Sequence, residues 1–555
     1  MIPDLWYKNA IIYSLSLDAF QDTDGDGVGD FRGAMRRLDY LQGLGVTAVW
    51  LAPFQPSPRR DHGYDIADYY GVDPRYGSPG DFVEFVNACH QRGLRVIMDL
   101  VVNHCSDQHP WFQAAIDDPT SKFRDYFIWA DKKPADADKG VVFPGVQKST
   151  WTYSRKAGAW YFHRFFKFQP DLNIANPDVQ AEILKIVSFW LQLGVSGFRM
   201  DAVPFLIAQD GINIADPAPA YGLLREIRAM AQWRKGDAVL LAEANIPPDE
   251  ALEYFGADGD RLHMLFNFPV NQALFYALAS ADGELLKDVL RASAPLPETA
   301  QWANFLRNHD ELDLGRLSEE QRQTVFEQFG PEPDMQLYGR GIRRRLAPML
   351  GGDRRRLELA YSIMLTLPGS PVLRYGDEVG MGDDLALPER DAARTPMQWS
   401  GGPQAGFTTG DAPVRPLIDH GPYAYREINV ARQRADGASL LNWTERAVRL
   451  RKELPEIGRG SWKVLDTPGH ILALRYDWEG ETSVIVHNLL GEASEFTLAL
   501  DRSEGGQRDL VCLQTDERVA AEADDDYVLI LQPYAYRWFR LGGLDELVRP
   551  HGSQH

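Results

Sequence analysis

Acidic residues follow short apolar runs at four places in this 555-residue chain. They are Asp99 in IMDLVVNH, Asp201 in GFRMDA, Glu243 in LLAEAN, and His309 with Asp310 in RNHDE. Carboxylates that gather at one place repel one another, a cost that proteins accept mainly where function uses it. Two carboxyl groups with different pKa values could cleave a glycosidic bond, because one protonates the leaving oxygen while the other attacks the anomeric carbon. A third could bind sugar hydroxyls, and any one alone could instead cap a helix.

A second group of acids forms the run DTDGDGVGD near the start of the chain. Its oxygen donors stand at positions one, three, five, seven and nine of an EF-hand-like loop: the side chains of Asp22, Asp24 and Asp26, the carbonyl of Val28 and the side chain of Asp30. Position twelve is Gly33 rather than an acid, so the loop is not a full EF-hand and the ion could be Mg²⁺ as well as Ca²⁺. We predict a structural ion here, and the alternative is an ordinary acidic turn.

The elements that would position these residues follow a repeating pattern. Eight apolar runs alternate with amphipathic helical stretches: AIIYSL, VTAVWLAPF, LRVIMDLVVNH, GFRMDAVP, AVLLAEAN, LHMLFNF, WANFLRNHD and SPVLRY. The pattern predicts an α/β fold with a (β/α)8 TIM barrel and chemistry at the strand C-termini, with a doubly wound sheet as the alternative. The segment NPDVQAEILKIVSFWLQLG predicts one barrel helix, capped by Asn176, with Pro177 in its first turn and Gly194 just beyond its end.

Changes in composition divide the chain into parts. The catalytic barrel is predicted over residues 1–104 and 177–455. Between them, residues 105–176 are rich in aromatic residues, His and Pro, and predict a lobe inserted after the third strand. Residues 311–345 follow the seventh strand and predict a lid. Residues 456–555 contain alternating segments such as TSVIVHNL, which predict a C-terminal antiparallel β-sandwich domain.

The overall composition limits the class of protein and of partner. The chain is 44% hydrophobic and 25% charged, with a net charge of −21, which is typical of a folded protein and argues against nucleic acid or anionic lipid as a partner. No window of about 20 apolar residues occurs and the start lacks a signal-peptide pattern, so we expect no membrane partner and a cytoplasmic location. The three cysteines lack CxxC spacing, which argues against a disulfide framework or a thiolate zinc site.

Taken together, these motifs resemble the signature regions of glycoside hydrolase family 13, the α-amylase family. DLVVNH, GFRMDA, the Glu of LLAEAN, RNHD and QPDLN correspond to those regions, and the resemblance covers nearly the whole chain. Within the family the sequence is most similar to trehalose synthases, through HGYDIADYYGVDPRYG, SDQHPWFQ, GIRRRLAPML and RTPMQWS. The resemblance therefore implies a retaining enzyme that acts on terminal α-glucosides.

The resemblance also implies a role for each matching residue. Asp201 would be the nucleophile, Glu243 the general acid and base, and Asp310 the acid that fixes ring hydroxyls. Asp99 would be a structural partner of these residues. The remaining matches would bind the terminal glucose or support the acids: Tyr64 stacking on the sugar, His104 and His309 bonding hydroxyls, Arg199 keeping the nucleophile ionised, and Asp65 paired with Arg394 at the closed far end of the pocket.

A second calcium site would use Asn103 and Asp171, again by resemblance. Similar enzymes carry an acid a few residues after DAVP where this chain has Ala208, so that site stays open. We expect structural Ca²⁺ or Mg²⁺, no organic cofactor, and small α-glucosides such as maltose and trehalose as partners; a homo-oligomer remains open.

Three hypotheses for the function follow. The leading one is interconversion of maltose and trehalose through a covalent β-glucosyl enzyme, in which the freed glucose turns in a closed pocket and attacks through its anomeric hydroxyl. If water or another alcohol takes the glucosyl group, the enzyme is an α-glucosidase or α-glucosyltransferase. A non-catalytic sugar-binding protein is the remote alternative, and the presence of the three acids Asp201, Glu243 and Asp310 together with Arg199, His104 and His309 argues against it.

Overall fold

The computed structural model describes residues 5–207, 221–293, 295–500, 509–522 and 526–542. At its centre is a closed barrel in the order β1-β14-β10-β9-β8-β7-β3-β2, with every pair of strands parallel. The strands are β1 (Ile12–Leu15), β2 (Ala48–Leu51), β3 (Arg95–Leu100), β7 (Gly197–Met200), β8 (Val239–Ala242), β9 (Met264–Phe266), β10 (Gln301–Phe305) and β14 (Ser370–Arg374). The eight apolar runs are these eight strands, so the predicted TIM barrel is confirmed.

Side chains fill the interior of the barrel. Ile12, Trp50, Ile97, Leu241 and Met264 belong to one apolar cluster and are each at most 2% exposed. Because such an interior is a packed core rather than a pore, polar chemistry is confined to the rim where the strands end.

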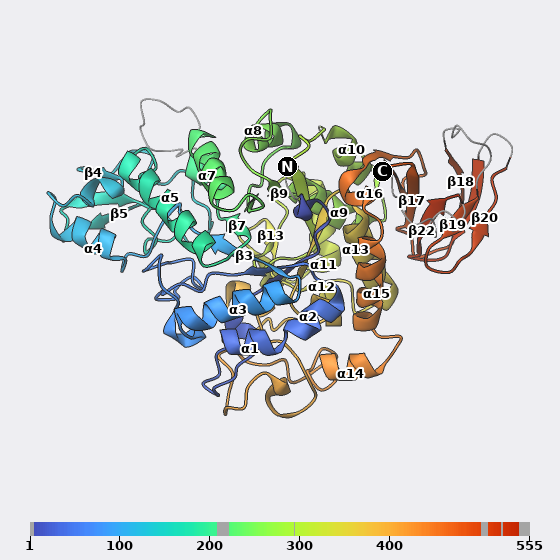
Figure 1. Ribbon diagram of the computed structural model, residues 1–555, viewed down its shortest axis with the longest axis horizontal. Coiled ribbons are helices and arrows are strands. Elements are labelled where there is room, and N and C mark those ends of the chain that lie inside the picture. Colours follow the sequence, from blue (N-terminus) through green and yellow to red (C-terminus); the bar gives the residue numbers. More distant parts are fainter. Residues whose placement is uncertain (1–4, 208–220, 294, 501–508, 523–525, 543–555) are drawn as a thin grey trace, which may run out of the picture.

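Helices surround the barrel (Figure 1). The principal ones are α1 (Phe31–Arg36), α2 (Leu38–Leu44), α3 (Pro79–Gln91), α5 (Pro177–Gln192), α7 (Tyr221–Arg234), α8 (Ala251–Phe255), α9 (Phe268–Ser280), α10 (Glu284–Ala292), α13 (Arg354–Thr366), α14 (Val430–Ala435) and α15 (Leu440–Lys452). The helix predicted after Asn176 is confirmed as α5: the Asn176 side chain accepts from the Asp178 nitrogen, and Gly194 beyond the helix has φ of +103°. Val187 and Trp190 on its inner face are fully buried.

Two insertions interrupt the barrel. Between β3 and β7 lie α4 (Pro110–Asp117) and a three-stranded antiparallel sheet of β4 (Trp129–Ala130), β6 (Ala159–Phe162) and β5 (Trp151–Ser154). We call residues 105–176 the lobe; its helix and strands lie at the left of Figure 1. Between β10 and β14 lie β11 (Leu312–Asp313), α11 (Glu319–Phe329), β12 (Gln336–Leu337), β13 (Gly341–Ile342) and α12 (Leu346–Met349). We call residues 311–345 the lid.

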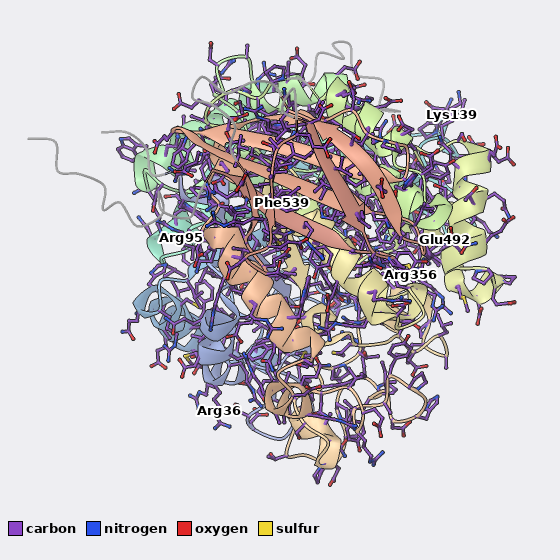
Figure 2. All side chains as sticks on the ribbon, turned by 90° about the vertical axis from the view of Figure 1, so that its right-hand side faces the viewer. Arg36, Arg95, Lys139, Arg356, Glu492 and Phe539 are labelled. Atoms are coloured by element: carbon purple, nitrogen blue, oxygen red, sulfur yellow. The ribbon has the colours of Figure 1, made fainter. Side chains whose placement is uncertain are left out.

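The C-terminal part is built from antiparallel strands, at the opposite end of the long axis from the lobe (Figure 1). After α16 (Glu456–Arg459), a six-stranded sheet and a two-stranded sheet are formed by β15 (Ser461–Val464), β16 (Ile471–Trp478), β17 (Glu481–Asn488), β18 (Ser494–Ala499), β19 (Leu510–Cys512), β20 (Arg518–Val519), β21 (Asp526–Leu531) and β22 (Tyr536–Leu541). Figure 2 looks onto this sheet, with Phe539 of β22 near its middle.

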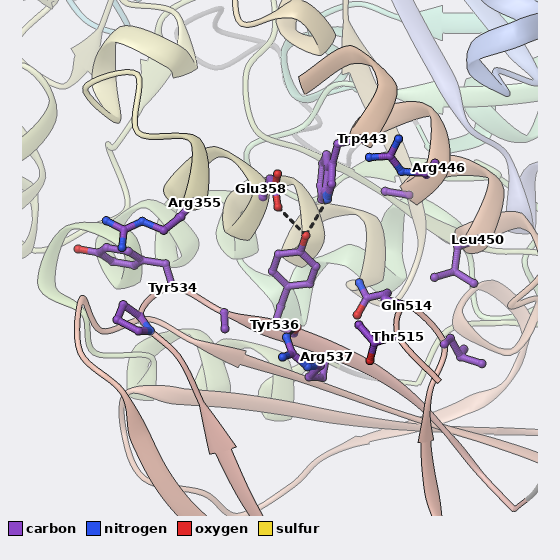
Figure 3. Close-up of a pocket in the computed structure, with 14 residues that line it drawn as sticks. Arg355, Glu358, Trp443, Arg446, Leu450, Gln514, Thr515, Tyr534, Tyr536 and Arg537 are labelled. Carbon is purple, nitrogen blue, oxygen red and sulfur yellow. Dashed lines mark hydrogen bonds between the residues drawn. The ribbon is translucent and has the colours of Figure 1, made fainter. Parts of the chain in front are cut away.

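Polar contacts join the C-terminal sheet to the barrel helices (Figure 3). Trp443 of α15 donates its Nε1–H to the Tyr536 hydroxyl at 2.7 Å, and that hydroxyl donates to Glu358 of α13 at 2.8 Å. A cavity of about 540 Å³ lies beside them. None of the helices in the described ranges is both long and apolar enough to cross a membrane.

Candidate active site

The barrel brings the predicted catalytic acids together at one rim. Met200 pairs with Ala242 in the β7–β8 ladder, so the residues that follow them, Asp201 and Glu243, are neighbours. Together with Asp310, which follows β10, both line a cavity of about 380 Å³. Of the predicted sugar-binding residues, the cavity is also lined by Tyr64, His104 and His309.

Arg199 is the buried centre of this group. It is 1% exposed, and its Nη1 donates to Asp201 at 2.7 Å and to Asp99 at 3.3 Å. Its Nη2 donates to Glu243. A planar guanidinium that cannot lose its proton holds the carboxylates of Asp201 and Glu243 at fixed positions.

The pKa values of the two carboxyl groups differ in the order that glycoside cleavage needs. Burial raises the pKa of Glu243 to about 7, with Arg199 opposing and the charge of Asp201 adding to the shift. Burial raises the pKa of Asp201 to about 6, against the charge of Arg199. The negative charge of Asp201 therefore favours the protonated form of Glu243, and the two groups titrate as a pair.

Asp310 is held ionised by its neighbours. Its carboxylate lies 2.9 Å from Arg390, 3.0 Å from Arg394 and 3.2 Å from His309 Nε2. Burial alone would raise the pKa of Asp310, but the charges of Arg390 and Arg394 bring it below the ordinary value. Its oxygens can therefore accept hydrogen bonds from sugar hydroxyls.

Tyr64 and His309 form one side of the cavity. Their rings stack with centroids 5.5 Å apart, and the Tyr64 hydroxyl lies 2.8 Å from His309 Nε2. The same hydroxyl donates to Asp99 at 2.7 Å, and Trp50 Nε1 donates to Asp99 at 2.9 Å. Burial lowers the pKa of His309 well below its ordinary value, so the ring is neutral. Asp99 is not among the residues that line the cavity.

His104 lines the cavity from the loop after β3. Its Nε2 lies 3.2 Å from the Tyr64 carbonyl, and burial lowers its pKa. Because a carbonyl can only accept, Nε2 carries the single N–H of this ring, and the neutral ring adds no charge to the pocket.

The predicted pairing of Asp65 with Arg394 is wrong. Asp65 is fully buried and accepts hydrogen bonds from Ser57 Oγ at 2.8 Å and from the backbone nitrogens of Arg60 and Asp61 at 3.1 and 3.2 Å. It fixes the loop and does not line the cavity. Arg394 lies behind the cavity, where it donates to Asp310 and to the carbonyl of His309.

Asp61 and Arg390 were not predicted from the sequence, and both line the cavity. Asp61 lines it and accepts from Gln169 at 2.8 Å, and Arg390 lines it and binds Asp310. Burial raises the pKa of Asp61, opposed first by the charge of Arg390. The signal was present, because Asp61 stands three residues before Tyr64 in the same loop.

The lobe and the lid meet over the cavity. Arg340 of the lid donates to the carbonyl of Val142 in the lobe at 3.1 Å, and the rings of Phe143 and Tyr338 lie 5.1 Å apart. The Arg390 guanidinium lies 5.1 Å from the Phe143 ring. Phe143, Arg340 and Arg390 also line the cavity, so aromatic and basic side chains form part of its wall.

The acidic loop near the N-terminus gathers three of the predicted ligands. Asp22, Asp24 and Asp30 each place a carboxylate oxygen within 4.8 Å of the others. Asp26 is not in this group, and its carboxylate accepts from the Val28 nitrogen at 2.7 Å. Carboxylate oxygens suit a hard cation, so these residues fit Ca²⁺ or Mg²⁺, whose charge would offset their mutual repulsion.

The second predicted cation site has one feature that fits. Asn103 donates to Asp171 at 3.2 Å, and its buried Oδ1 has no hydrogen-bond partner among the described residues. Burial raises the pKa of Asp171 to about 6. An unpaired amide oxygen beside a carboxylate is a donor pair that a hard cation accepts, whereas Ala208 lies outside the described residues.

Comparison with known proteins agrees with this geometry. Residues 12–328 and 343–460 match the family described as alpha amylase, catalytic domain. The chain is 42% identical to a trehalose synthase of Thermus thermophilus over 97% of its own length, although it spans only 56% of that protein. It is 40% identical to the trehalose synthase/amylase TreS of Mycobacterium tuberculosis, covering 97% of this chain and 90% of that one.

Solved structures show the same architecture. An α-amylase from H. orenii superimposes with a TM-score of 0.77 at 27% identity, over 96% of this chain and 99% of that chain. The trehalulose synthase MutB from Pseudomonas mesoacidophila MX-45 superimposes with a TM-score of 0.76 at 28% identity, over 97% and 99%. The family match covers most of this chain and includes the barrel and the acids at its strand ends. The chain therefore belongs to the α-amylase family, glycoside hydrolase family 13, and is an enzyme of that family.

Proposed function

We propose that this enzyme interconverts maltose and trehalose by an intramolecular transfer of glucose. The observation that carries the proposal is the pair of Asp201 and Glu243 on one buried guanidinium, Arg199, inside a cavity covered by the lobe and the lid. The two carboxyl groups supply the chemistry of a retaining glycosidase. The lobe and the lid, which meet at the cavity, would keep the freed glucose inside it.

In the first step the terminal glucose of maltose binds between Tyr64, His104 and Asp310. An Asp201 oxygen attacks the anomeric carbon, the bond from that carbon to the bridging oxygen breaks, and Glu243 gives its proton to the bridging oxygen. The products are a β-glucosyl ester of Asp201 and a glucose molecule. Arg199 stabilises the negative charge on Asp201 before attack and on Glu243 after it has lost its proton.

In the second step the freed glucose turns and presents its anomeric hydroxyl. Glu243 removes the proton of that hydroxyl, whose oxygen attacks the anomeric carbon of the ester, and the bond to Asp201 breaks. Two inversions at one carbon retain the α configuration, and the product is trehalose. Asn245, Glu311 and Asp313 line the cavity and offer polar groups to the turning sugar.

The relatives support this choice and also a second candidate. Proteins named trehalose synthase match at 39–42% identity over nearly the whole chain. At 31% identity the relatives include a trehalose-6-phosphate hydrolase of Escherichia coli and an oligo-1,6-glucosidase of Heyndrickxia coagulans. An α-glucosidase or α-glucosyltransferase that passes glucose to water or another alcohol is therefore the second candidate.

The test is incubation with maltose in the presence of ¹³C-labelled free glucose, followed by chromatography and mass spectrometry of the products. We expect trehalose as the main product, without label, because the freed glucose does not leave the pocket. Glucose as the only product would favour the hydrolase, and label in the trehalose would show that the acceptor comes from solution.

A further inference from the structure

A large cavity lies at the opposite end of the barrel from the catalytic acids. Its volume is about 640 Å³, and it is lined by Gln301 and Trp302 at the start of β10, by Gly369 just before β14, and by Lys8, which precedes β1. The barrel strands are parallel, so residues at their amino ends lie at the rim away from Asp201. The cavity is therefore separate from the substrate pocket.

The other wall of the cavity comes from α16 and β15, where the C-terminal part begins. Four residues of these elements line it: Gly458, Arg459, Trp462 and Lys463. The Gln301 side chain joins the two walls, because its Nε2 donates to the carbonyl of Lys8 at 3.0 Å and to that of Gly458 at 2.7 Å. A molecule in the cavity would therefore touch the barrel and the C-terminal part at once.

Positive side chains dominate the lining. One acid and four basic residues line the cavity: Glu298, Lys8, Arg291, Arg459 and Lys463. Arg291 is paired with Asp466 at 2.9 Å. The Lys8 ammonium, in contrast, donates to the carbonyl of Ala300 at 2.7 Å, and neither Lys8 nor Arg459 has a carboxylate partner among the described residues. In a chain with a net charge of −21, this local excess of cations has a cost that function can explain.

Lys8 and Arg459 are close enough to repel each other. Burial lowers the pKa of Lys8 to about 8; the charge of Glu298 opposes this shift and the charge of Arg459 adds to it. Glu298 is exposed to solvent and forms no ion pair with either residue. The positive charge at this half-buried place is therefore not compensated, and an anion between the two side chains would be stabilised by both.

The size and the lining of the cavity favour an organic anion. Small-molecule sites have volumes of about 300–1,000 Å³, and this cavity falls within that range. A phosphate monoester carries about 1.5 to 2 negative charges near neutral pH, which matches the two cations without a carboxylate, Lys8 and Arg459. The half-buried ring of Trp462 offers an apolar face to a ring attached to the phosphate.

We propose that this cavity binds a phosphate monoester carried on a small ring compound, a sugar phosphate or a nucleoside monophosphate. The phosphate contacts Lys8 and Arg459, and the attached ring lies against Trp462. Because the ligand bridges the barrel and the C-terminal part, its binding stabilises the contact between them. The site goes beyond the proposed glucosyl transfer, none of whose steps needs this ligand.

The first test measures binding to the wild-type protein in phosphate-free buffer at constant ionic strength. Inorganic phosphate, glucose 6-phosphate and adenosine monophosphate are the probes, in thermal melts and calorimetric titrations. One of the two organic phosphates should bind at least about tenfold more tightly than inorganic phosphate and should raise the melting temperature by about 2 °C or more at saturation. The tighter of the two identifies the ring. No saturable binding of either, or equal binding of inorganic phosphate, would overturn the proposal.

The second test is Lys8→Met, with Lys132→Met in the lobe as the control. Lys132 is exposed and is not among the residues that line the cavity. Lys8→Met should lose at least about tenfold in affinity for the organic phosphate, because one of its two cations is gone, whereas Lys132→Met should keep the wild-type affinity. Equal affinity of the two variants would place the ligand elsewhere, for example in the substrate pocket, and would overturn the site.

A third measurement labels Lys8 in the wild-type protein, so it decides even if Lys8→Met does not fold. Pyridoxal phosphate carries a phosphate monoester and an aldehyde on one ring; the aldehyde condenses with a neutral lysine amine and releases water, and borohydride reduces the imine to a stable amine. Peptide mass spectrometry should find Lys8 labelled ahead of the other lysines, and the tighter organic phosphate should protect it. Equal labelling of all lysines, or no protection, would contradict the site. None of these measurements uses maltose or trehalose, so their failure is distinct from a failure of the proposed function.

Discussion

The guanidinium of Arg199 lies 2.7 Å from the carboxylate of Asp201, which follows it by two residues on the same strand end. In an extended strand, residues two apart point to the same face, so local geometry sets this contact. The second Nη of Arg199 reaches Glu243 on the neighbouring strand end. One strand therefore positions the nucleophile and, through its arginine, the proton donor.

Replacing either catalytic carboxylate should remove turnover without unfolding the protein. Asp201→Asn should reduce product formation from maltose to background, because no covalent ester can form. Glu243→Gln should lower kcat by about 10²–10⁴-fold, and added azide should recover rate with p-nitrophenyl α-glucoside, whose leaving group needs no proton. Glu84→Gln on the exposed face of α3 is the matched control. Near-native activity of either variant would remove that residue from its role.

The activity should have a narrow pH range. Asp201 must be ionised, so kcat/KM should rise as pH rises through about 6, the pKa of Asp201 in the folded protein. Glu243 must be protonated, so kcat/KM should fall as pH rises through about 7. Because Asp201 and Glu243 interact, the apparent pKa values of the rising and falling parts of the pH profile describe the two groups together. Initial rates from acid to alkaline pH measure this profile, and an optimum above about pH 8 would contradict the assignment.

The two aspartates of the loop after β2 should behave differently when changed. Asp61→Asn weakens contacts within the pocket and should lower kcat/KM for maltose by about 10–100-fold with little change in melting temperature. Asp65→Asn disturbs buried bonds to the loop and should instead lower the melting temperature. Steady-state kinetics and thermal melts of both variants compare them directly. The reverse pattern would return Asp65 to the role predicted from the sequence.

Opening the contact between lid and lobe should change the products rather than the chemistry. Arg340→Ala removes the hydrogen bond to the Val142 carbonyl, so water should reach the glucosyl ester more easily. The ratio of glucose to trehalose formed from maltose should rise severalfold, measured by chromatography at equal conversion. Arg322→Ala on α11 is the control. An unchanged ratio would show that this contact does not retain the sugar.

The acidic loop should affect stability but not catalysis. Asp24→Asn removes one of the converging carboxylates, so the melting temperature should stop responding to added Ca²⁺ or to EDTA, while kcat at room temperature stays near the wild-type value. Asp26→Asn is the matched control, because Asp26 lies outside the converging group. If Asp26→Asn abolishes the response and Asp24→Asn does not, the ligand set is different.

Much of the barrel and its acids could be predicted from the sequence. The eight apolar runs specify strands because alternating helices force parallel pairing, and parallel strands expose their carboxyl ends at one rim. Asp201 and Glu243 stand directly after β7 and β8, so their meeting requires only that these two strands pair in parallel. The start of α5 is equally local, since Asn176 caps the helix within two residues of itself.

What the tertiary structure alone decided lies in the loops. Sequence motifs marked the loop containing Asp61 and Asp65, but both residues are acidic and nothing in the motif says which one faces the sugar. Strands have a fixed alternation of faces, whereas a loop has none, so packing chooses the orientation of each side chain. The contact of Arg340 with Val142 joins positions 198 residues apart. Such a contact depends on a distant partner, and no local pattern encodes it.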